Sequence, residues 1–101
     1  MEFLSRSLLS ADVSADLQSR LCASDLSWLD GRLTAGEQAA LVKHNWQLDP
    51  AECLTEQITT AVSEALRSDP LVKSFCLIRK IHSLLVSRCD VGHEYGWHVD
   101  N

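Results

Sequence analysis

Trp97-His98-Val99-Asp100-Asn101 stands at the C-terminal end of the 101 residues and decides how the rest is interpreted. Side chains on a β-strand alternate between its two faces, so a strand here would point His98 and Asp100 the same way. An imidazole and a carboxylate side by side form two thirds of the facial triad that holds non-haem Fe(II). The pair therefore predicts two iron ligands, and nothing follows Asn101 in this sequence that could supply the third.

Two other interpretations of this segment stay open. Taken alone, His98 and Asp100 could be surface side chains at a frayed end of the chain. His93 could act as a substitute third ligand, but it lies five residues from His98 and so on the opposite face of a regular strand. Only a bulge at Gly96 would bring it round.

Composition indicates a globular chain without an evident nucleic-acid or membrane partner. Apolar residues make up 46%, the net charge is −5, and the basic residues are scattered. No apolar run approaches the ~20 residues that a membrane span needs. The first six residues carry an early acid and no basic-then-apolar order, so they do not resemble a signal peptide. We therefore expect a cytoplasmic location.

The four cysteines, Cys22, Cys53, Cys76 and Cys89, are too far apart for a C-x-x-C motif. An even number permits disulfides, but in the expected compartment reduced, partly buried thiols are favoured.

Periodicity divides the chain into helices and strands. Apolar spacing predicts helices over 11–23 and from Asp49-Pro50 to 68, with a second short helical stretch over 70–75. Thr34-x-x-Glu37 has the form of a capping box before a helical turn. Strands are predicted over 26–30, 42–48, 81–89 (largely buried) and 93–100. Gly96 would be a bulge or a close backbone approach.

This order predicts an α+β fold with an unfinished sheet, since the final strand has no later partner in the sequence. The 101 residues then form a single partial domain. Trp28, Trp46 and Trp97 are predicted to be core residues. His44 and His82 are predicted to lie at a sheet surface or in a polar contact.

Two ordered blocks of residues resemble a known family. The first is Trp28-x-Asp30-Gly31-Arg32-x-Thr34-Ala35-Gly36-x-Gln38-Ala39-x-x-Val42-Lys43-x-Asn45-x-Gln47-Leu48, and the second is Arg88 followed by Gly92-His93-Glu94-Tyr95-Gly96-Trp97-His98-Val99-Asp100. Together they resemble the N-terminal portion of the PKHD-type hydroxylases, which are prolyl-4-hydroxylase-like Fe(II)/2-oxoglutarate-dependent dioxygenases. Two blocks at plausible spacing are far more specific than a lone His-x-Asp.

The resemblance implies N-terminal helices and the first strands of a double-stranded β-helix, or jelly roll, here truncated. It implies that His98 and Asp100 bind Fe(II), and that 2-oxoglutarate and ascorbate take part. The family's distal His and its 2-oxoglutarate-binding Arg have no counterpart in these residues. Cys89 stands where the family usually has Tyr, and a thiol is a weak substitute for a hydroxyl.

Other site roles follow from the same resemblance. Tyr95 is retained and is a candidate for co-substrate binding. Asp30 and Arg32 lie in a loop that the family places near the active-site mouth, so they could contact substrate. A turn with a surface ion pair explains Asp30 and Arg32 equally well.

The sequence thus predicts part of a hydroxylase that is inactive alone. The competing interpretations are a non-catalytic α+β binding module and one half of a split or oligomeric oxygenase completed by another chain. The expected substrate is a small molecule or a peptidyl residue.

Overall fold

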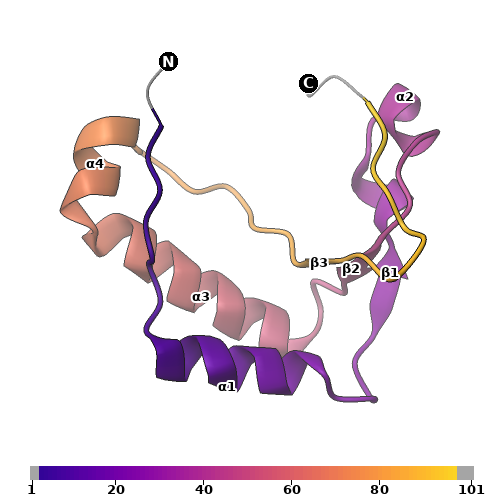
Figure 1. The fold of residues 1–101 in the computed structure, drawn as a ribbon, viewed down its shortest axis with the longest axis horizontal. Helices are drawn as coiled ribbons and strands as arrows, with labels where there is room; N and C mark the ends of the chain where they lie inside the picture. The colour runs from indigo at the N-terminus through magenta and orange to yellow at the C-terminus, as the bar shows by residue number, and fades with distance from the viewer. Residues whose placement is uncertain (1–2, 98–101) are drawn as a thin grey trace. The chain divides into compact units, whose positions relative to one another are not determined.

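A computed structural model describes residues 3–97, so residues 1–2 and 98–101 lie outside the described part (Figure 1). The elements, in chain order, are α1 (Ala11–Leu21), β1 (Trp28–Asp30), the 3₁₀ helix η1 (Gly31–Thr34), α2 (Glu37–Ala40), β2 (Trp46–Leu48), α3 (Cys53–Ser68), α4 (Pro70–Cys76) and β3 (Ser87–Arg88). The predicted α+β class is confirmed, because the described residues form α-helices and one small antiparallel sheet.

The chain forms two compact units. The first comprises Met1–Ser24 and Cys53–Leu84, and the second comprises Asp25–Glu52 and Leu85–Asn101. The helices α1, α3 and α4 belong to the first unit. The sheet, η1 and α2 belong to the second.

In the first unit α1 packs beside α3 (Figure 1). Helix α1 starts at Ser10, whose hydroxyl accepts a hydrogen bond from the Val13 amide at 3.2 Å. This is the usual way in which a serine satisfies an orphan donor at a helix start. Helix α3 turns Leu54, Thr55 and Ile58 inward, and these three are its buried residues.

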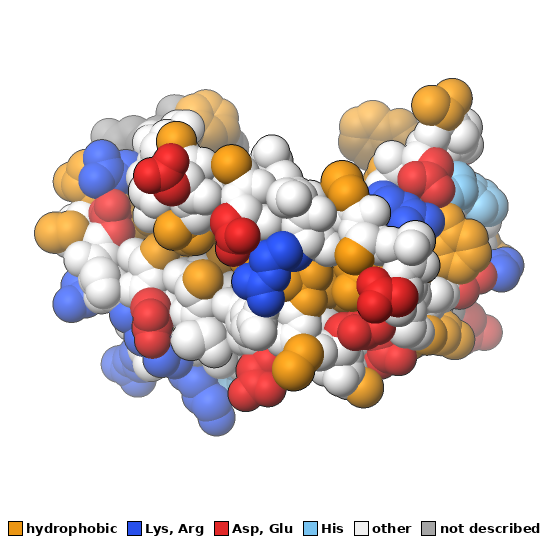
Figure 2. Space-filling model, turned by 90° about the horizontal axis from the view of Figure 1, so that it is seen from below, with side chains coloured by type: hydrophobic (Ala, Val, Ile, Leu, Met, Phe, Trp, Pro, Cys, Tyr) orange, Lys and Arg blue, Asp and Glu red, His pale blue; other side chains and the backbone are white. Residues whose placement is uncertain are grey.

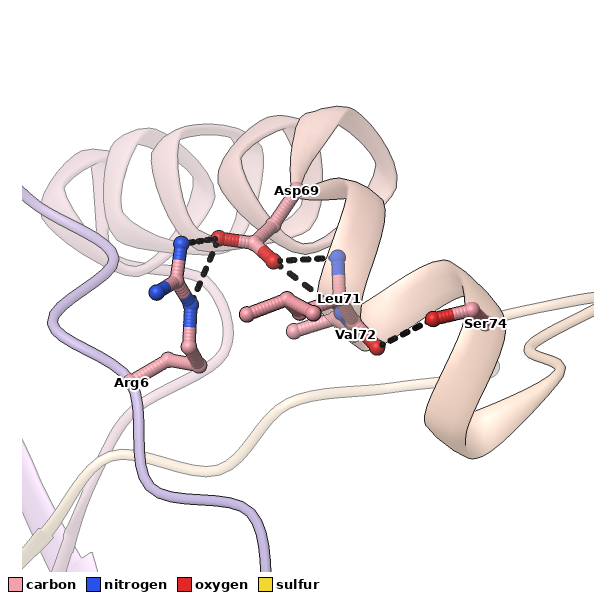
Figure 3. A network of polar contacts seen from close by, with 5 residues as sticks. All are labelled: Arg6, Asp69, Leu71, Val72 and Ser74. Carbon is pink, nitrogen blue, oxygen red and sulfur yellow. Dashed lines mark hydrogen bonds and ion pairs between the residues drawn. The ribbon is translucent and has the colours of Figure 1, made fainter.

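Asp69 joins α3 to α4 and also fixes the N-terminal segment (Figure 3). One carboxylate oxygen accepts hydrogen bonds from the amides of Leu71 and Val72, both at 3.0 Å, which caps α4. The other accepts from Arg6, at 3.1 Å from Nε and 2.9 Å from Nη2. The pKa of Asp69 is lowered, first by the hydrogen bonds from Arg6 and then by that from the Val72 amide.

In the second unit the strands lie in the order β1-β2-β3, all antiparallel. Trp28 pairs with Leu48, and Asp30 pairs with Trp46. Leu48 is the most buried apolar side chain there, at 3% exposed. The register places Asp30 and Trp46 next to each other at the end of the sheet where the candidate site lies.

Several boundaries differ from the sequence predictions. Helix α3 begins at Cys53 instead of Asp49, and residues 50–52 form a turn before it. The Asp49 carboxylate accepts from the Ala51 amide as an N-cap would, but the Glu52 carboxylate accepts from the Ser27 amide and so does not complete a capping box. Helix α2 is capped by Gly36 without a side-chain bond, so the predicted capping box at Thr34 is wrong.

The strand predicted over 81–89 is also wrong over most of its length. Only Ser87–Arg88 pairs, and no residue from 81 to 89 is buried. The strand predicted over 42–48 is reduced to Trp46–Leu48. Trp97 is fully exposed instead of lying in a core, while Trp28 and Trp46 are partly exposed.

The surface of the described residues carries charges of both signs. On the face drawn in Figure 2, acidic and basic side chains are interspersed with apolar ones. Within residues 3–97, no helix is both long and apolar enough to cross a bilayer.

Candidate functional site

Two segments far apart in the sequence pair beyond the ends of the sheet. Lys43 and Tyr95 form an isolated antiparallel bridge. The His44 amide donates to the Glu94 carbonyl at 2.7 Å, and the Gly96 amide donates to the Val42 carbonyl at 2.9 Å. These bonds hold residues 94–96 against residues 42–44.

Gly96 permits this approach. A Cβ at this position would lie 2.9 Å from the Val42 Cβ, which is closer than real Cβ contacts come. The predicted close backbone approach at Gly96 is therefore confirmed.

A polar pocket of about 200 Å³ lies in this second unit. The residues that line it come from the end of β1, from the approach to β2, and from the turn before Tyr95: Asp30, Arg32, Lys43, His44, Asn45, Trp46 and His93. Asp30 and Arg32, which the sequence singles out as substrate contacts, are among them. Of the other five, the sequence considered only His93 for a site, as a substitute metal ligand, and assigned no site role to Lys43, His44, Asn45 or Trp46.

Asp30 and Arg32 form a close ion pair at the pocket. Nη2 of Arg32 lies 2.6 Å from Oδ2 of Asp30, Nε donates to both oxygens, and the Arg32 amide donates to Oδ1 at 2.9 Å. These bonds lower the pKa of Asp30 to about 2, the side-chain bonds from Arg32 having the largest effect. The same pairing raises the pKa of Arg32. Asp30 is therefore an ionised carboxylate at neutral pH and cannot donate a proton there.

His93 is fixed by the turn that contains it. Its Nδ1 accepts from the Asp90 amide at 3.1 Å, and its own amide donates to the Asp90 carbonyl at 2.9 Å. Because Nδ1 is an acceptor, the neutral ring carries its proton on Nε2. The ring lies 6.2 Å from that of Trp46, tilted by 59°.

Lys43 is the most buried charged residue of the described chain that lines this pocket, at 6% exposed. Its Nζ lies 3.3 Å from the hydroxyl oxygen of Thr34 and 5.1 Å from the centre of the Tyr95 ring. The Thr34 hydroxyl in turn reaches Oε1 of buried Gln47 at 2.6 Å. This chain of contacts explains why Thr34 does not cap α2.

The predicted iron ligands, His98 and Asp100, lie outside the described residues. Tyr95, the candidate for co-substrate binding, is 38% exposed and takes part in the cation–π contact with Lys43. Among residues 3–97 no three His, Cys, Asp or Glu side chains gather as a metal site. The chemistry of the donor pair fits Fe(II), because imidazole nitrogen and carboxylate oxygen are both found in its facial triads.

Two further predictions about side chains need correction. All four cysteines are free thiols, as favoured, but they are exposed and not partly buried. Cys89 is among them, so it does not act as a small buried apolar side chain. Arg88, its neighbour, lies with its guanidinium carbon 4.6 Å from the centre of the Trp28 ring.

The whole chain is similar to proteins named PKHD-type hydroxylase. It is 62% identical to one from Synechococcus sp. (strain CC9605), 54% identical to one from Synechococcus sp. (strain CC9902), and 48% identical to one from Prochlorococcus marinus (strain MIT 9313). Each match covers 100% of this chain and 46% of the relative. The resemblance stated from the two sequence blocks is thereby confirmed.

The chain therefore spans about half the length of the curated relatives it matches. No protein-family model matches it, and no solved structure does.

Proposed function

Because this chain is similar along its entire length to part of the PKHD-type hydroxylases, we propose that it forms part of an Fe(II)- and 2-oxoglutarate-dependent hydroxylase. The whole-length identity of up to 62% carries this proposal. In it, the antiparallel strands β1, β2 and β3 belong to a jelly roll whose remaining strands lie in the other half of the relatives' length.

His98 and Asp100 are the proposed metal ligands. At neutral pH a histidine offers an unprotonated nitrogen and an aspartate an ionised oxygen, which is the donor set that Fe(II) accepts. Bound iron, with O₂ and 2-oxoglutarate, would supply the oxidising power for hydroxylation of a C–H bond, with ascorbate keeping the metal reduced. The polypeptide's own part is to place the metal, the co-substrate and the target.

The described residues contribute to placement. The pairing of residues 94–96 with residues 42–44 fixes the backbone two residues before His98. Tyr95 is the proposed co-substrate contact. The pocket that Asp30 and Arg32 line is the proposed place for part of the substrate. Because Arg32 bonds to both oxygens of Asp30, the proposed role of the pair is to line the pocket without net charge, and not to act as an acid or a base.

Residues 1–101 as an isolated polypeptide are proposed to bind iron weakly and to turn over negligibly. Two ligands leave the metal more hydrated and more labile than three. The second candidate, an oxygenase completed by another chain, is favoured by the exposed apolar side chains of the sheet unit, including Leu33, Leu41 and Trp97. The third candidate function is that of a non-catalytic binding module.

Metal binding can be tested with Mn²⁺ as a paramagnetic stand-in for Fe(II) in NMR of residues 1–101. We expect line broadening of the Trp97 and Tyr95 signals, and its loss in His98→Ala and in Asp100→Ala. His82→Ala and Asp25→Ala are matched controls that remove the same kinds of side chain outside the proposed metal-binding motif. Broadening that survives both ligand substitutions would overturn the assignment.

Turnover is tested separately by succinate release with Fe(II), 2-oxoglutarate and ascorbate. We expect none above background from residues 1–101. Release at the rate of a PKHD-type relative of full length would contradict the predicted inactivity, and would favour the completed-oxygenase alternative if the active species is larger than one chain.

A further inference from the structure

The charges that line the polar pocket do not balance. Arg32 and Lys43 are cations, and Asp30 is the only carboxylate among the seven lining residues. Arg32 and Asp30 neutralise each other at 2.6 Å. The charge that remains is the ammonium of Lys43, in a chain whose net charge is −5.

Lys43 has no carboxylate partner in the described part of the chain. The ion pairs found there join Arg6 to Asp69, Arg20 to Asp16, Arg32 to Asp30 and Arg88 to Asp90. At 6% exposed, Lys43 has lost most of its hydration and receives in return one hydroxyl oxygen and one ring face. A buried charge without a counter-ion is costly, so an anion at this place would be strongly favoured.

The pocket also offers a hydrogen-bond donor that a ligand could use. Nδ1 of His93 is occupied by the Asp90 amide, which leaves its Nε2–H as a donor. The oxygens of Asp30 are occupied by Arg32. Asn45 also lines the pocket, and its Oδ1 is buried against Gly31 without a hydrogen-bond partner among the described residues, so it is an acceptor that the proposed carboxylate does not use.

We propose that this pocket binds the carboxylate group of a small molecule, held by Lys43 Nζ and His93 Nε2–H beside the ring of Trp46. A volume of about 200 Å³ is too small for most drug-sized ligands, whose pockets start at roughly 300 Å³. It holds a carboxylate and a short carbon chain. The inference rests on the proposed function, whose substrate pocket this is, and it names the chemical group that the pocket takes. The site needs no iron and does not include His98 or Asp100, so a titration without metal can fail while the metal-binding experiment succeeds, and the reverse.

The experiment is an NMR titration of metal-free residues 1–101 with acetate, at constant ionic strength, following the ring signals of His93 and Trp46. We expect saturable shifts with a Kd on the order of 1 mM. Acetamide, which has the same shape and no charge, is expected to produce none. N-acetyl-dialanine with a free C-terminus distinguishes a peptide source from a free small acid, and tighter binding of the peptide would support the carboxylate site while assigning it to chain ends.

Lys43→Met removes the charge and keeps most of the volume, and it is expected to weaken acetate binding roughly tenfold or more. Lys43→Arg retains the charge and is expected to retain part of the binding. Lys73→Met in α4 is the matched control, expected to change nothing. A thermal melt gives a second readout: acetate should raise the Tm of the wild type and of the control but not that of Lys43→Met.

Three results would overturn the proposal. The first is equal shifts with acetate and acetamide. The second is unchanged affinity in Lys43→Met. The third is inorganic phosphate binding as tightly as acetate at the same signals, because that would show a general attraction of anions instead of a carboxylate site.

Discussion

At the scale of single residues, two glycines hold the pocket region together by lacking a side chain. Gly96 lies against Val42, and Gly31 lies against Asn45. A Cβ on Gly31 would lie 1.7 Å from the Asn45 side-chain oxygen and 3.0 Å from the Asn45 carbonyl oxygen. The side chain can rotate away, but the carbonyl also accepts the Gly31 amide and is fixed.

Gly31→Ala is therefore expected to destabilise the second unit by about 1–3 kcal/mol, the usual cost of forcing an extra methyl into a packed place. Urea unfolding followed by the Trp46 signal measures it. Asn45→Ala combined with Gly31→Ala is expected to recover part of the loss, because it removes the nearest clashing atom. No loss of stability in the single variant would contradict the packing described here.

Asp30 gives a pH dependence at the same scale. Its pKa is about 2 in the folded chain against an ordinary value of 3.8, so its ion pair stabilises the fold fully above about pH 4 and loses that effect as the pH falls toward 2. Arg32→Met removes the cause, and the pKa of Asp30 is expected to rise toward 3.8. Carboxyl ¹³C NMR titration measures the shift directly. An unchanged low pKa in Arg32→Met would show that another group holds the charge.

At the scale of elements, α3 supplies three of the buried residues of the first unit, while α1 supplies none and α4 supplies Val72. Leu54 and Ile58 are 5% and 8% exposed and lie four residues apart, on one face of the helix. Glu56, between them in sequence, is exposed. Four-residue apolar spacing is the signal from which the helix was predicted.

Leu54→Ala and Ile58→Ala are each expected to destabilise the first unit by about 2–3 kcal/mol, from lost apolar burial and the cavity left behind. Glu56→Ala is the exposed control and is expected to change the free energy of unfolding by less than about 0.5 kcal/mol. Denaturant unfolding followed by helical circular dichroism compares the three. Equal effects at positions 54 and 56 would contradict the assigned buried face.

The helices could be predicted from the sequence because their signals are local. Apolar spacing along α1 and α3 needs no distant partner, whereas the capping of α4 by Asp69 was not predicted. The strand predicted over 81–89 failed because pairing and burial of an apolar run depend on neighbouring strands, and only Ser87–Arg88 meets β2. The capping box failed for a related reason, since the Thr34 hydroxyl bonds to distant Gln47.

The candidate site was predictable only in part. Asp30 and Arg32 were candidates because the resemblance places their loop near the active-site mouth, and the ion pair that they form was the alternative interpretation. The sequence did not place Lys43 and His93 in one pocket, because they are fifty residues apart and are brought to it only through the pairing of residues 94–96 with residues 42–44. Alternation in 42–48 predicted one continuous strand. In the structure only Trp46–Leu48 forms a strand, and Lys43 instead forms a separate bridge with Tyr95.

At the scale of the whole molecule, little apolar surface is buried. The buried apolar side chains of the described residues are Ala39, Leu48, Leu54, Ile58 and Val72, and none of them is fully enclosed. Both units are much smaller than a typical domain, and small cores give marginal stability.

Residues 1–101 are therefore expected to melt at low temperature and with low cooperativity. Leu48→Ala is expected to lower the melting midpoint of signals from the sheet unit more than that of signals from the helical unit, and Val72→Ala should do the reverse. NMR peak intensities followed with temperature separate the two. A single sharp transition at high temperature, displaced equally by both substitutions, would contradict this expectation.

The hydrogen bond from the Gly96 amide to the Val42 carbonyl joins two parts of the chain that are far apart in sequence. Lys43 follows Val42 directly, and Trp97 follows Gly96 directly, so each of these residues is one peptide unit away from the hydrogen bond. A side chain added at Gly96 would push residues 94–96 away from Val42, and it would thereby also disturb the neighbouring Lys43 and the pocket that Lys43 lines.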